Sequence, residues 1–490
     1  MKKIKIGLIL IMATIFFNSY AQLNNFNLSD YKLPDLERRS LETNFNLSGQ
    51  NDYYKINPYG QDKTGENSYY GNIYINYKHY LNSAKLQQET NLGLNFSSNF
   101  YNRKEDKELV SKSSNINPQI YLQRNNRKYF NTNYFFETDV FLNYQYGRNY
   151  TYSKYSDGSE NKENLQTHRM LAYIPLKIGL GRVEPVQDAR QAIYILDELY
   201  KANRISSVKS DEKIIEFAEF ISKLKNKRFF DSRLKKIAEI EAIDSFLVAK
   251  NYLKKSDARY FTTIEDFWDY GNSPMRNSGT RFSFAILPGY YIYNNNLEDK
   301  IYSSSYKYNI NALLFDGGIE IKHEKPLNLY WQNSINLNAY AGLIEGNLNN
   351  KTNSIEKDIR IPNIQLGFNQ SIGFYPNTRT DISFRYSFQY VQLFDKADVQ
   401  NEIIGAGGKG AKAETDLLIN YYISPKFRLN ITSSFYYIWQ DSEMTINYDN
   451  TVGSSCMLYN YTSNTNGYVD YIKRNSLANN FRISLIYSVF

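Results

Sequence analysis

Apolar and polar residues alternate along most of this chain, and this period of two predicts β-strands. Within residues 129–147, Phe136 and Val140 fall on one face of the extended chain, and Glu137 and Asp139 fall on the other. Successive side chains of a strand point to opposite faces. Each such segment therefore predicts a strand that is apolar on one side and polar on the other.

The alternating segments form two groups, six before residues 183–278 and eight after them. They cover residues 41–57, 69–81, 86–100, 115–124, 129–147, 165–182, 279–293, 305–323, 329–344, 360–374, 380–394, 411–423, 427–440 and 477–490. Most exceed the mean strand of a globular protein, which has about 5 to 6 residues, and a tilted strand crosses lipid in about 9 to 11. We predict an all-β, antiparallel, up-and-down transmembrane β-barrel of about 14 strands, within a range of about 12 to 16.

The connections between these segments alternate in length. Short turns are expected at residues 82–85, 124–127, 324–328, 375–379 and 424–426. Longer loops, charged or rich in Tyr and Asn, are expected at residues 58–68, 101–114, 148–164, 295–304, 345–359, 395–410 and 441–476. Outer-membrane barrels place their short turns in the periplasm and their long loops outside the cell. We therefore expect an even number of strands, with both ends of the barrel sequence on the periplasmic side.

Residues 183–278 interrupt the alternation with apolar residues at steps of three and four, which is helix spacing. One helix is expected from about Pro185 to Tyr200, a second from Ser210 and a third after Asp231. The strand count places this three-helix bundle and its return segment in the periplasm. Such a bundle is about 25 Å long and some 20 Å across, too wide for a lumen of about 14 strands. We expect a lid or docking domain under the barrel mouth, with insertion as a plug as the alternative.

Two features of this insert leave alternatives open. In the return segment, Phe267 and Trp268 either anchor at the membrane interface or pack against the bundle. The middle of the bundle is basic, which indicates either a solvated helix face or a surface for a periplasmic protein, peptidoglycan or an anionic solute. The candidate partner surface consists of Lys223, Lys225, Lys227, Arg228, Arg233, Lys235 and Lys236.

The start of the chain predicts export. Residues 1–5 are basic, residues 6–17 are apolar, and residues 19–21 form a small-residue cleavage site. This order is typical of a secretory signal peptide. We expect cleavage after residue 21, followed by a periplasmic N-terminal segment over residues 22–40.

Composition narrows the class further. Cys456 is the single cysteine, so an internal disulfide is excluded. Aromatic residues make up 16% of the chain, and tyrosine predominates, as in the aromatic belts of membrane barrels. The formal net charge of +8 is modest and spread along the chain. We expect lipid rather than nucleic acid as the surrounding partner.

Together these features make the chain resemble Gram-negative outer-membrane β-barrel proteins of the porin-like kind, over about residues 41–182 and 279–490. The final strand, NNFRISLIYSVF, ends on Phe490. In that family a terminal aromatic residue is read by the barrel-assembly machinery, so the resemblance implies this partner and a place in the cell outer membrane. Phe490 departs from the pattern, because it falls one residue off the apolar parity that Phe481 and Ile483 set.

The residues offer little for catalysis. Of the three histidines, only His168 is expected near an extracellular strand end, where a barrel hydrolase would be a remote possibility. The Gly408-Lys409 pair lacks the Ser or Thr and the upstream Gly of a phosphate-binding loop. Loop carboxylates show no defined ligand spacing for Ca²⁺. We predict no enzyme, no cofactor and no metal.

The polar parity of the strands supplies candidate residues of the lumen. These are Glu137, Asp139, Lys177, Arg281, Glu320, Lys322, Asp381, Arg385, Glu414, Asp416, Arg428 and Arg482. Such charges either orient polar solutes in a transverse field or pair with one another and brace the barrel. The leading hypothesis is a channel for small polar solutes, gated or coupled by the periplasmic helical domain. The alternatives are an outer-membrane anchor whose helical domain docks a partner in secretion, surface assembly or envelope tethering, and a carrier of hydrophobic molecules with the N-terminal segment in its lumen.

Overall fold

The computed structural model of the chain describes most of its length. The described residues are 26–55, 63–105, 108–131, 133–155, 157–206, 210–225, 232–271, 276–299, 304–350, 355–394, 408–424, 427–442, 445–446, 459–460 and 472–487. The predicted signal peptide and Phe490 lie outside them.

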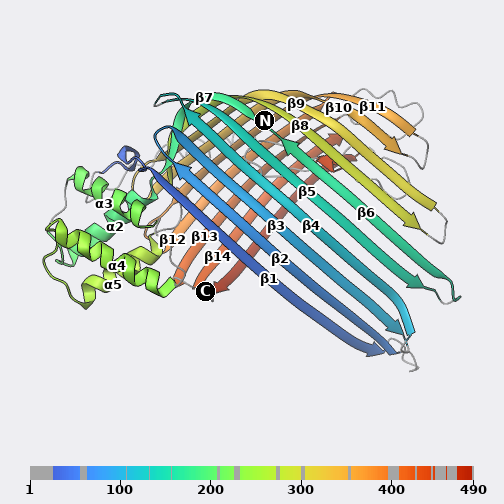
Figure 1. The fold of residues 1–490 in the computed structure, drawn as a ribbon, viewed down its shortest axis with the longest axis horizontal. Helices are drawn as coiled ribbons and strands as arrows, with labels where there is room; N and C mark the ends of the chain where they lie inside the picture. Colours follow the sequence, from blue (N-terminus) through green and yellow to red (C-terminus); the bar gives the residue numbers. More distant parts are fainter. Residues whose placement is uncertain are drawn as a thin grey trace, which may run out of the picture.

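Fifteen of the strands form one antiparallel sheet that curls into a barrel (Figure 1). They are β1 (Leu36–Lys55), β2 (Lys63–Asn82), β3 (Leu86–Glu105), β4 (Glu108–Tyr129), β5 (Tyr134–Lys154), β6 (Glu160–Tyr173), β7 (Leu176–Pro185), β8 (Asn277–Asp299), β9 (Ser304–Pro326), β10 (Trp331–Asn350), β11 (Ile355–Phe374), β12 (Thr380–Leu393), β13 (Gly408–Ser424), β14 (Phe427–Ser442) and β17 (Ile472–Tyr487). A separate hairpin pairs β15 (Thr445–Ile446) with β16 (Tyr459–Asn460).

Along the sheet, each strand pairs with its neighbours in sequence, which is the up-and-down order that the alternation predicts. β6 and β7 share one position, because both lie between β5 and β8. Ile174 and Pro175 separate them and still bond the neighbouring strands: Ile174 N donates to Pro288 O, and Pro175 O accepts from Asp139 N. The path therefore has fourteen positions from β1 to β17, as the sequence predicts. No ladder joins β1 to β17 within the described residues.

Several boundaries differ from the prediction. The strands continue into the predicted long loops, because neighbouring strands stay paired beyond the length that lipid requires. The loop predicted at residues 148–164, for example, is shortened, since β5 ends at Lys154 and β6 starts at Glu160. The turn predicted at 124–127 is wrong. That segment belongs to β4, whose Tyr129 pairs with Phe135. Residues 36–40 belong to β1 rather than to the N-terminal segment.

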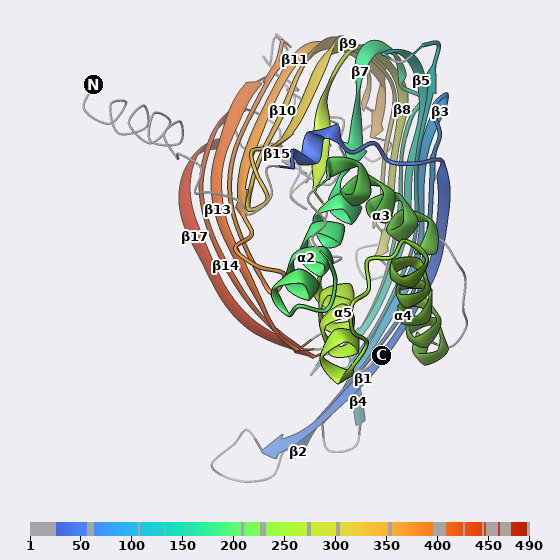
Figure 2. The ribbon, with the colours of Figure 1, turned by 90° about the vertical axis from the view of Figure 1, so that its left-hand side faces the viewer.

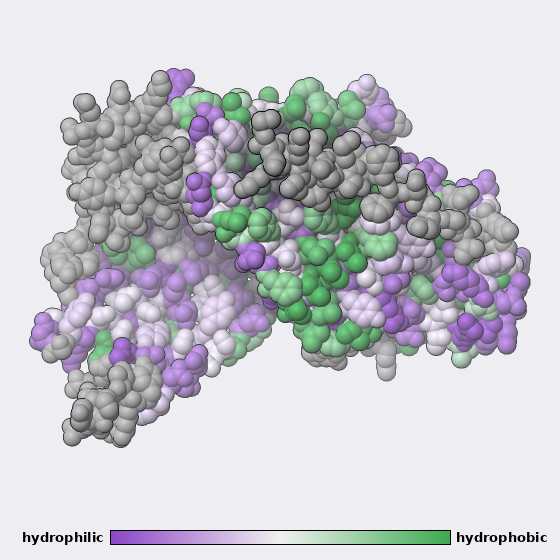
Figure 3. Space-filling view, turned by 180° about the vertical axis from the view of Figure 1, so that it is seen from behind, coloured by the Kyte–Doolittle hydropathy of each residue, from purple (hydrophilic) through white to green (hydrophobic). Residues whose placement is uncertain are grey.

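The two faces of the wall differ as the alternation predicts. On β8, Phe284 and Ile286 are 55% and 49% exposed, whereas Ser283 and Ala285 between them are 1% and 3% exposed. Large apolar side chains thus point away from the lumen, where lipid would cover them. Figure 3 shows apolar residues gathered on the wall between more polar surfaces at its ends. None of the described helices is long and apolar enough to span a membrane.

Four helices, not three, follow β7. They are α2 (Gln187–Lys201), α3 (Asp211–Leu224), α4 (Ser232–Ala249) and α5 (Ala258–Tyr270). The predicted return segment is largely α5. Asp257 caps the start of this helix, because its carboxylate accepts from Tyr260 N at 3.2 Å. Tyr260, Ile264 and Trp268 recur at steps of four and are buried, so α5 is held by tertiary packing.

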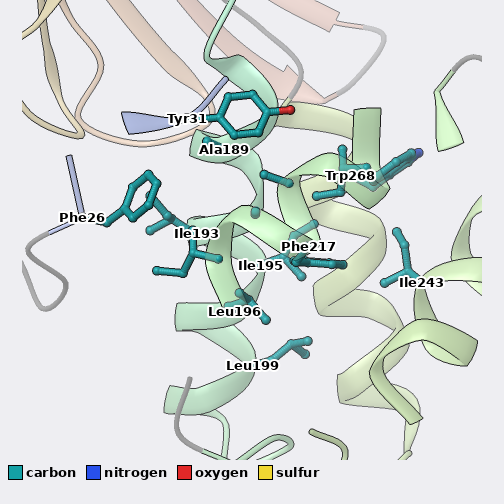
Figure 4. Close-up of a cluster of buried hydrophobic side chains, with 14 of the residues drawn as sticks. Phe26, Tyr31, Ala189, Ile193, Ile195, Leu196, Leu199, Phe217, Ile243 and Trp268 are labelled. Carbon is teal, nitrogen blue, oxygen red and sulfur yellow. The ribbon is translucent and has the colours of Figure 1, made fainter. Parts of the chain in front are cut away.

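The helices and the N-terminal segment share one hydrophobic core (Figure 4). Phe26 and Tyr31 from that segment pack with Ile193, Phe217 and other apolar residues of the helices. The N-terminal segment therefore belongs to the helical domain and not to the lumen. Trp268 also lies in this core, and its Nε1 donates to Glu239 at 2.7 Å. Packing against the bundle, rather than anchoring at the interface, is its role.

The helical domain lies across one mouth of the barrel (Figure 2). Arg276 fastens it to the β9–β10 turn, because its guanidinium donates to the carbonyls of Asn328, Leu329 and Trp331 at 2.6 to 2.7 Å. Arg190 donates to the Asn377 carbonyl in the β11–β12 turn at 3.2 Å. The domain thus sits where a lid would sit, outside the strands.

Candidate functional site

A cavity of about 730 Å³ lies inside the barrel, at the end that the helical domain covers. Strands β1 to β5 and β7 to β12 contribute its lining. Pro185 and Asn277, where the chain leaves and re-enters the sheet, belong to that lining, so the cavity lies directly beneath the helices. Most of the lining residues are polar, with many Asn and Gln side chains, which suits water and polar solutes.

A row of charges crosses one wall of this cavity. Arg127 is the cross-strand partner of Glu137, and Glu137 is the partner of Lys177. Arg127 Nε donates to Glu137, and Lys177 Nζ lies 3.5 Å from Glu137 and 3.1 Å from Asp139. Glu320 reaches the same ammonium from β9 at 3.0 Å. We call Arg127, Glu137, Asp139, Lys177 and Glu320 the lumen cluster.

Neighbouring polar groups add hydrogen bonds to the lumen cluster, although Asp139 Oδ1 has no hydrogen-bond partner among the described residues. Gln87 Oε1 accepts from Arg127 at 3.2 Å and from the Tyr129 hydroxyl at 2.9 Å. The Tyr340 hydroxyl donates to Glu320. Removing one member of a buried ion pair leaves an uncompensated charge, at a cost of about 3 to 5 kcal/mol. For these residues, the geometry matches the interpretation that inward charges pair with one another and brace the barrel.

A second pair lies on another part of the wall. Arg385 and Asp416 are cross-strand partners on β12 and β13, and Arg385 Nε donates to Asp416 at 2.7 Å. The Arg385 side chain is 45% exposed and lines the cavity, whereas Asp416 and Asp381 do not. Asp381 accepts from Asn420 at 2.8 Å. One cationic side chain therefore faces the cavity from this wall.

The remaining predicted lumen residues divide into two groups. Arg281 and Lys322 line the cavity on β8 and β9. Glu414, Arg428 and Arg482 lie outside its lining: Glu414 binds Lys412 at 2.9 Å, Arg428 contacts the Tyr422 hydroxyl at 3.5 Å, and Arg482 donates to Ser484 at 3.0 Å. The structure thus brings seven of the twelve predicted residues to one cavity and leaves five away from it.

The candidate partner surface is less basic than its sequence indicates. Lys225 is 12% exposed and binds Asp188, and Lys236 binds Glu265 at 2.5 Å and Asp269 at 2.7 Å. Lys223 is exposed, and Lys235 lies 3.8 Å from Glu239. Lys227, Arg228 and the side chain of Arg233 lie outside the described part of the chain. Docking of a periplasmic partner stays a prediction.

Sequence reasoning missed a polar node that joins the helical domain to the barrel. Asp188, in the first turn of α2, accepts from Lys225 at 2.6 Å, from Arg38 of β1 at 3.2 Å and from Ser222. The Tyr31 hydroxyl lies 2.7 Å from Ser222 Oγ. We call these five residues the Asp188 latch. An acidic residue near a helix start was visible in the sequence, but its distant partners were not.

Charge is stabilised within the Asp188 latch. Burial alone would raise the pKa of Asp188, but Lys225 and Arg38, together with the hydrogen bonds from Lys225 and Ser222, hold it below its ordinary value. Burial lowers the pKa of Lys225, and the attraction of Asp188 offsets this only in part. Burial raises the pKa of Tyr31, which keeps its hydroxyl protonated.

Each of the three histidines contacts described neighbours. His168 Nδ1 lies 3.1 Å from the Tyr144 hydroxyl, and its ring packs on Tyr146. His79 contacts Glu37 at 2.9 Å, and His323 contacts a threonine hydroxyl. Within the described ranges, no group of three or more His, Cys, Asp or Glu side chains is placed to hold a metal ion.

Comparisons with known proteins add little to this picture. No family model and no curated protein match the chain. Among solved structures, the translocator domain of autotransporter NalP from Neisseria meningitidis aligns with 81% of this chain and 91% of its own, at 10% identity and a TM-score of 0.27. The TodX deltaS2S3 mutant monoaromatic hydrocarbon channel aligns with 84% of this chain and 87% of its own, at 8% identity and a TM-score of 0.28. The strand pairing therefore carries the fold assignment.

Proposed function

We propose that this protein is an outer-membrane channel for small polar solutes, whose passage is restricted or coupled by the periplasmic helical domain. The observation that carries the proposal is the polar cavity of about 730 Å³ directly beneath that domain. A barrel wall with an apolar exterior supports insertion into the outer membrane. The barrel-assembly machinery is the proposed partner for insertion.

The lining of the cavity favours polar solutes over hydrophobic molecules. Apolar side chains such as Phe141, Leu337 and Phe368 are a minority among the described lining residues. The N-terminal segment, which a hydrophobic carrier would place in its lumen, packs instead into the helical core through Phe26 and Leu28. A tunnel for apolar molecules would need a continuous apolar lining.

Control of this cavity by the helical domain is supported by the polar contacts that tie the domain to the barrel at several points. The Asp188 latch binds α2 to β1 through Arg38. Asp266 of α5 pairs with Arg379 next to β12. Passage from the cavity to the periplasm then requires a route around the helices or a displacement of the domain.

Locking the helical domain to the barrel tests the proposal. In a Cys456→Ser background, Asp266→Cys and Arg379→Cys replace an ion pair between α5 and the β11–β12 turn. A bis-methanethiosulfonate reagent joins the two thiols and is released by dithiothreitol. In planar bilayers we expect the cross-linked chain to conduct less than the reduced chain, and reduction to restore the current.

The two single-cysteine variants, treated with the same reagent, control for labelling alone. A reduced chain without conductance at any voltage would refute the channel. Equal conductance of the linked and reduced forms would instead refute control by the helical domain and leave the channel intact.

A further inference from the structure

The cavity beneath the helical domain has an excess of positive charge. Cationic side chains outnumber carboxylates among the described residues that line it, although Arg38 and Arg385 pair with Asp188 and Asp416 outside the lining. Three of the carboxylates, Glu137, Asp139 and Glu320, are already bound by Lys177 at 3.0 to 3.5 Å. Glu137 also accepts from Arg127. Most carboxylates of the lining are therefore already paired within the lumen cluster.

Arg281 and Lys322 are placed differently from the lumen cluster. They are direct cross-strand partners on β8 and β9, and both line the cavity. Like charges directly opposite each other on neighbouring strands destabilise a sheet. Arg127 adds a third positive charge that acts on Arg281.

The surroundings neutralise this pair only in part, because Glu137 and Glu320 attract Arg281 without reaching ion-pair distance. Among the described residues, no carboxylate lies within ion-pair distance of the Arg281 guanidinium. Lys322 lies 3.8 Å from Glu324, near the limit of an ion pair, and Glu89 attracts it electrostatically from farther away. On the other side of Arg281, its partner on β7 is Gly181, which brings no charge to the pair. The two cations therefore face the cavity that they line.

We infer that Arg281 and Lys322 form a binding site for a small anion that carries carboxylate or phosphate groups. The planar guanidinium of Arg281 presents paired N–H donors to such a group, and the ammonium of Lys322 adds a point charge. A bound anion relieves the repulsion between the two side chains. The selectivity of the channel for such anions follows only if the proposed channel function holds, so this part of the inference rests on the proposed function.

Ion selectivity tests the transport part of this inference. With the full chain in a planar bilayer under a KCl gradient, we expect the reversal potential to show a preference for Cl⁻. In Arg281→Gln, the ratio of Cl⁻ to K⁺ permeability falls severalfold. The matched control is Arg482→Gln on β17, which removes an arginine outside the cavity lining and leaves the ratio unchanged.

A binding measurement separates the site from the channel. Citrate and inorganic phosphate, compared with NaCl at equal ionic strength, should raise the thermal unfolding midpoint of the full chain in detergent, because a ligand of the folded state stabilises it. Arg281→Gln should lose most of this shift, and Arg482→Gln should keep it.

The outcomes distinguish the two proposals. Conductance with a preference for K⁺, or stabilisation by citrate or phosphate that Arg281→Gln retains, overturns the anion site while the channel stands. Stabilisation that depends on Arg281 in a chain that does not conduct supports the site and overturns the channel.

Discussion

For Lys177, the alternation of apolar and polar residues predicts the face of the strand but not the partners of the side chain. Alternation along residues 165–182 puts Lys177 on the polar face, and the same reasoning puts Glu137, Asp139 and Glu320 there. Their meeting depends on the register of β5 with β7 and on that of β8 with both β7 and β9, because the Glu320 carboxylate reaches across β8 to within 3.0 Å of the Lys177 ammonium. Glu320 is 143 positions away along the chain, so local pattern carries no signal for that contact.

Replacement of Lys177 by methionine should destabilise the barrel strongly. The substitution keeps most of the side-chain volume but leaves three carboxylates without their common cation. We expect the free energy of unfolding, measured by urea titration of the chain in detergent, to fall by about 3 to 5 kcal/mol.

The control is Lys250→Met, which breaks an ion pair with Glu216 that is 41% and 44% exposed. An exposed pair contributes about 0 to 1 kcal/mol. Equal losses in the two variants would show that burial of the lumen cluster has no energetic consequence.

At the scale of elements, long periodic segments were predictable and short or composite ones were not. The alternation predicts every long strand position of the described sheet. It predicts β6 and β7 as one strand, because apolar and polar residues still alternate on both sides of the break at Pro175. It missed α5, although the buried residues Tyr260, Ile264 and Trp268 recur at helix spacing. Helices of this length depend on packing more than on propensity.

The dependence of α5 on packing makes a prediction about Ile264, which is fully buried in the helical core. Ile264→Ala should destabilise the helical domain by about 2 to 5 kcal/mol, through lost burial and a cavity. Limited proteolysis should then cut the domain faster, while the heat-modifiable mobility of the folded barrel on a gel stays unchanged.

Thr262→Ala changes an exposed position of the same helix and serves as the control. A loss of barrel mobility in Ile264→Ala would mean that barrel and helical domain unfold as one unit.

At the scale of the whole molecule, the contact between the helical domain and the barrel was the least predictable feature. The size argument placed the helices at the mouth, and they lie there. Arg276 and Arg190 bind turns that lie more than fifty positions away in the sequence, and Arg379 of the β11–β12 turn binds Asp266 of α5. Arg276 gives no signal in the sequence, because most of its partners are backbone carbonyls.

Arg276 supplies a test of this docking. Its guanidinium is buried and donates to three carbonyls of residues 328–331 and to Gln332. Hydrogen bonds from a charged donor contribute about 1.5 to 3 kcal/mol each. Arg276→Gln should therefore loosen the domain from the β9–β10 turn, and hydrogen exchange of residues 327–331 should quicken.

Arg204→Gln removes an arginine that pairs with Asp257 inside the helical domain, and it controls for a general loss of charge. Unchanged exchange at the turn in Arg276→Gln would show that other contacts hold the domain in place.

The position of the helical domain also bears on the order of folding. Pro185 and Asn277, which flank the four helices, are cross-strand partners, so the helices form the connection of one hairpin, β7–β8. An unstructured connection over residues 186–276 would impose a large loop-closure entropy on that hairpin. A domain dominated by local helical contacts folds quickly and brings its two ends together. Folding of the helices before membrane insertion would turn the longest connection between strands of the sheet into a preformed turn, and strand pairing would start from there.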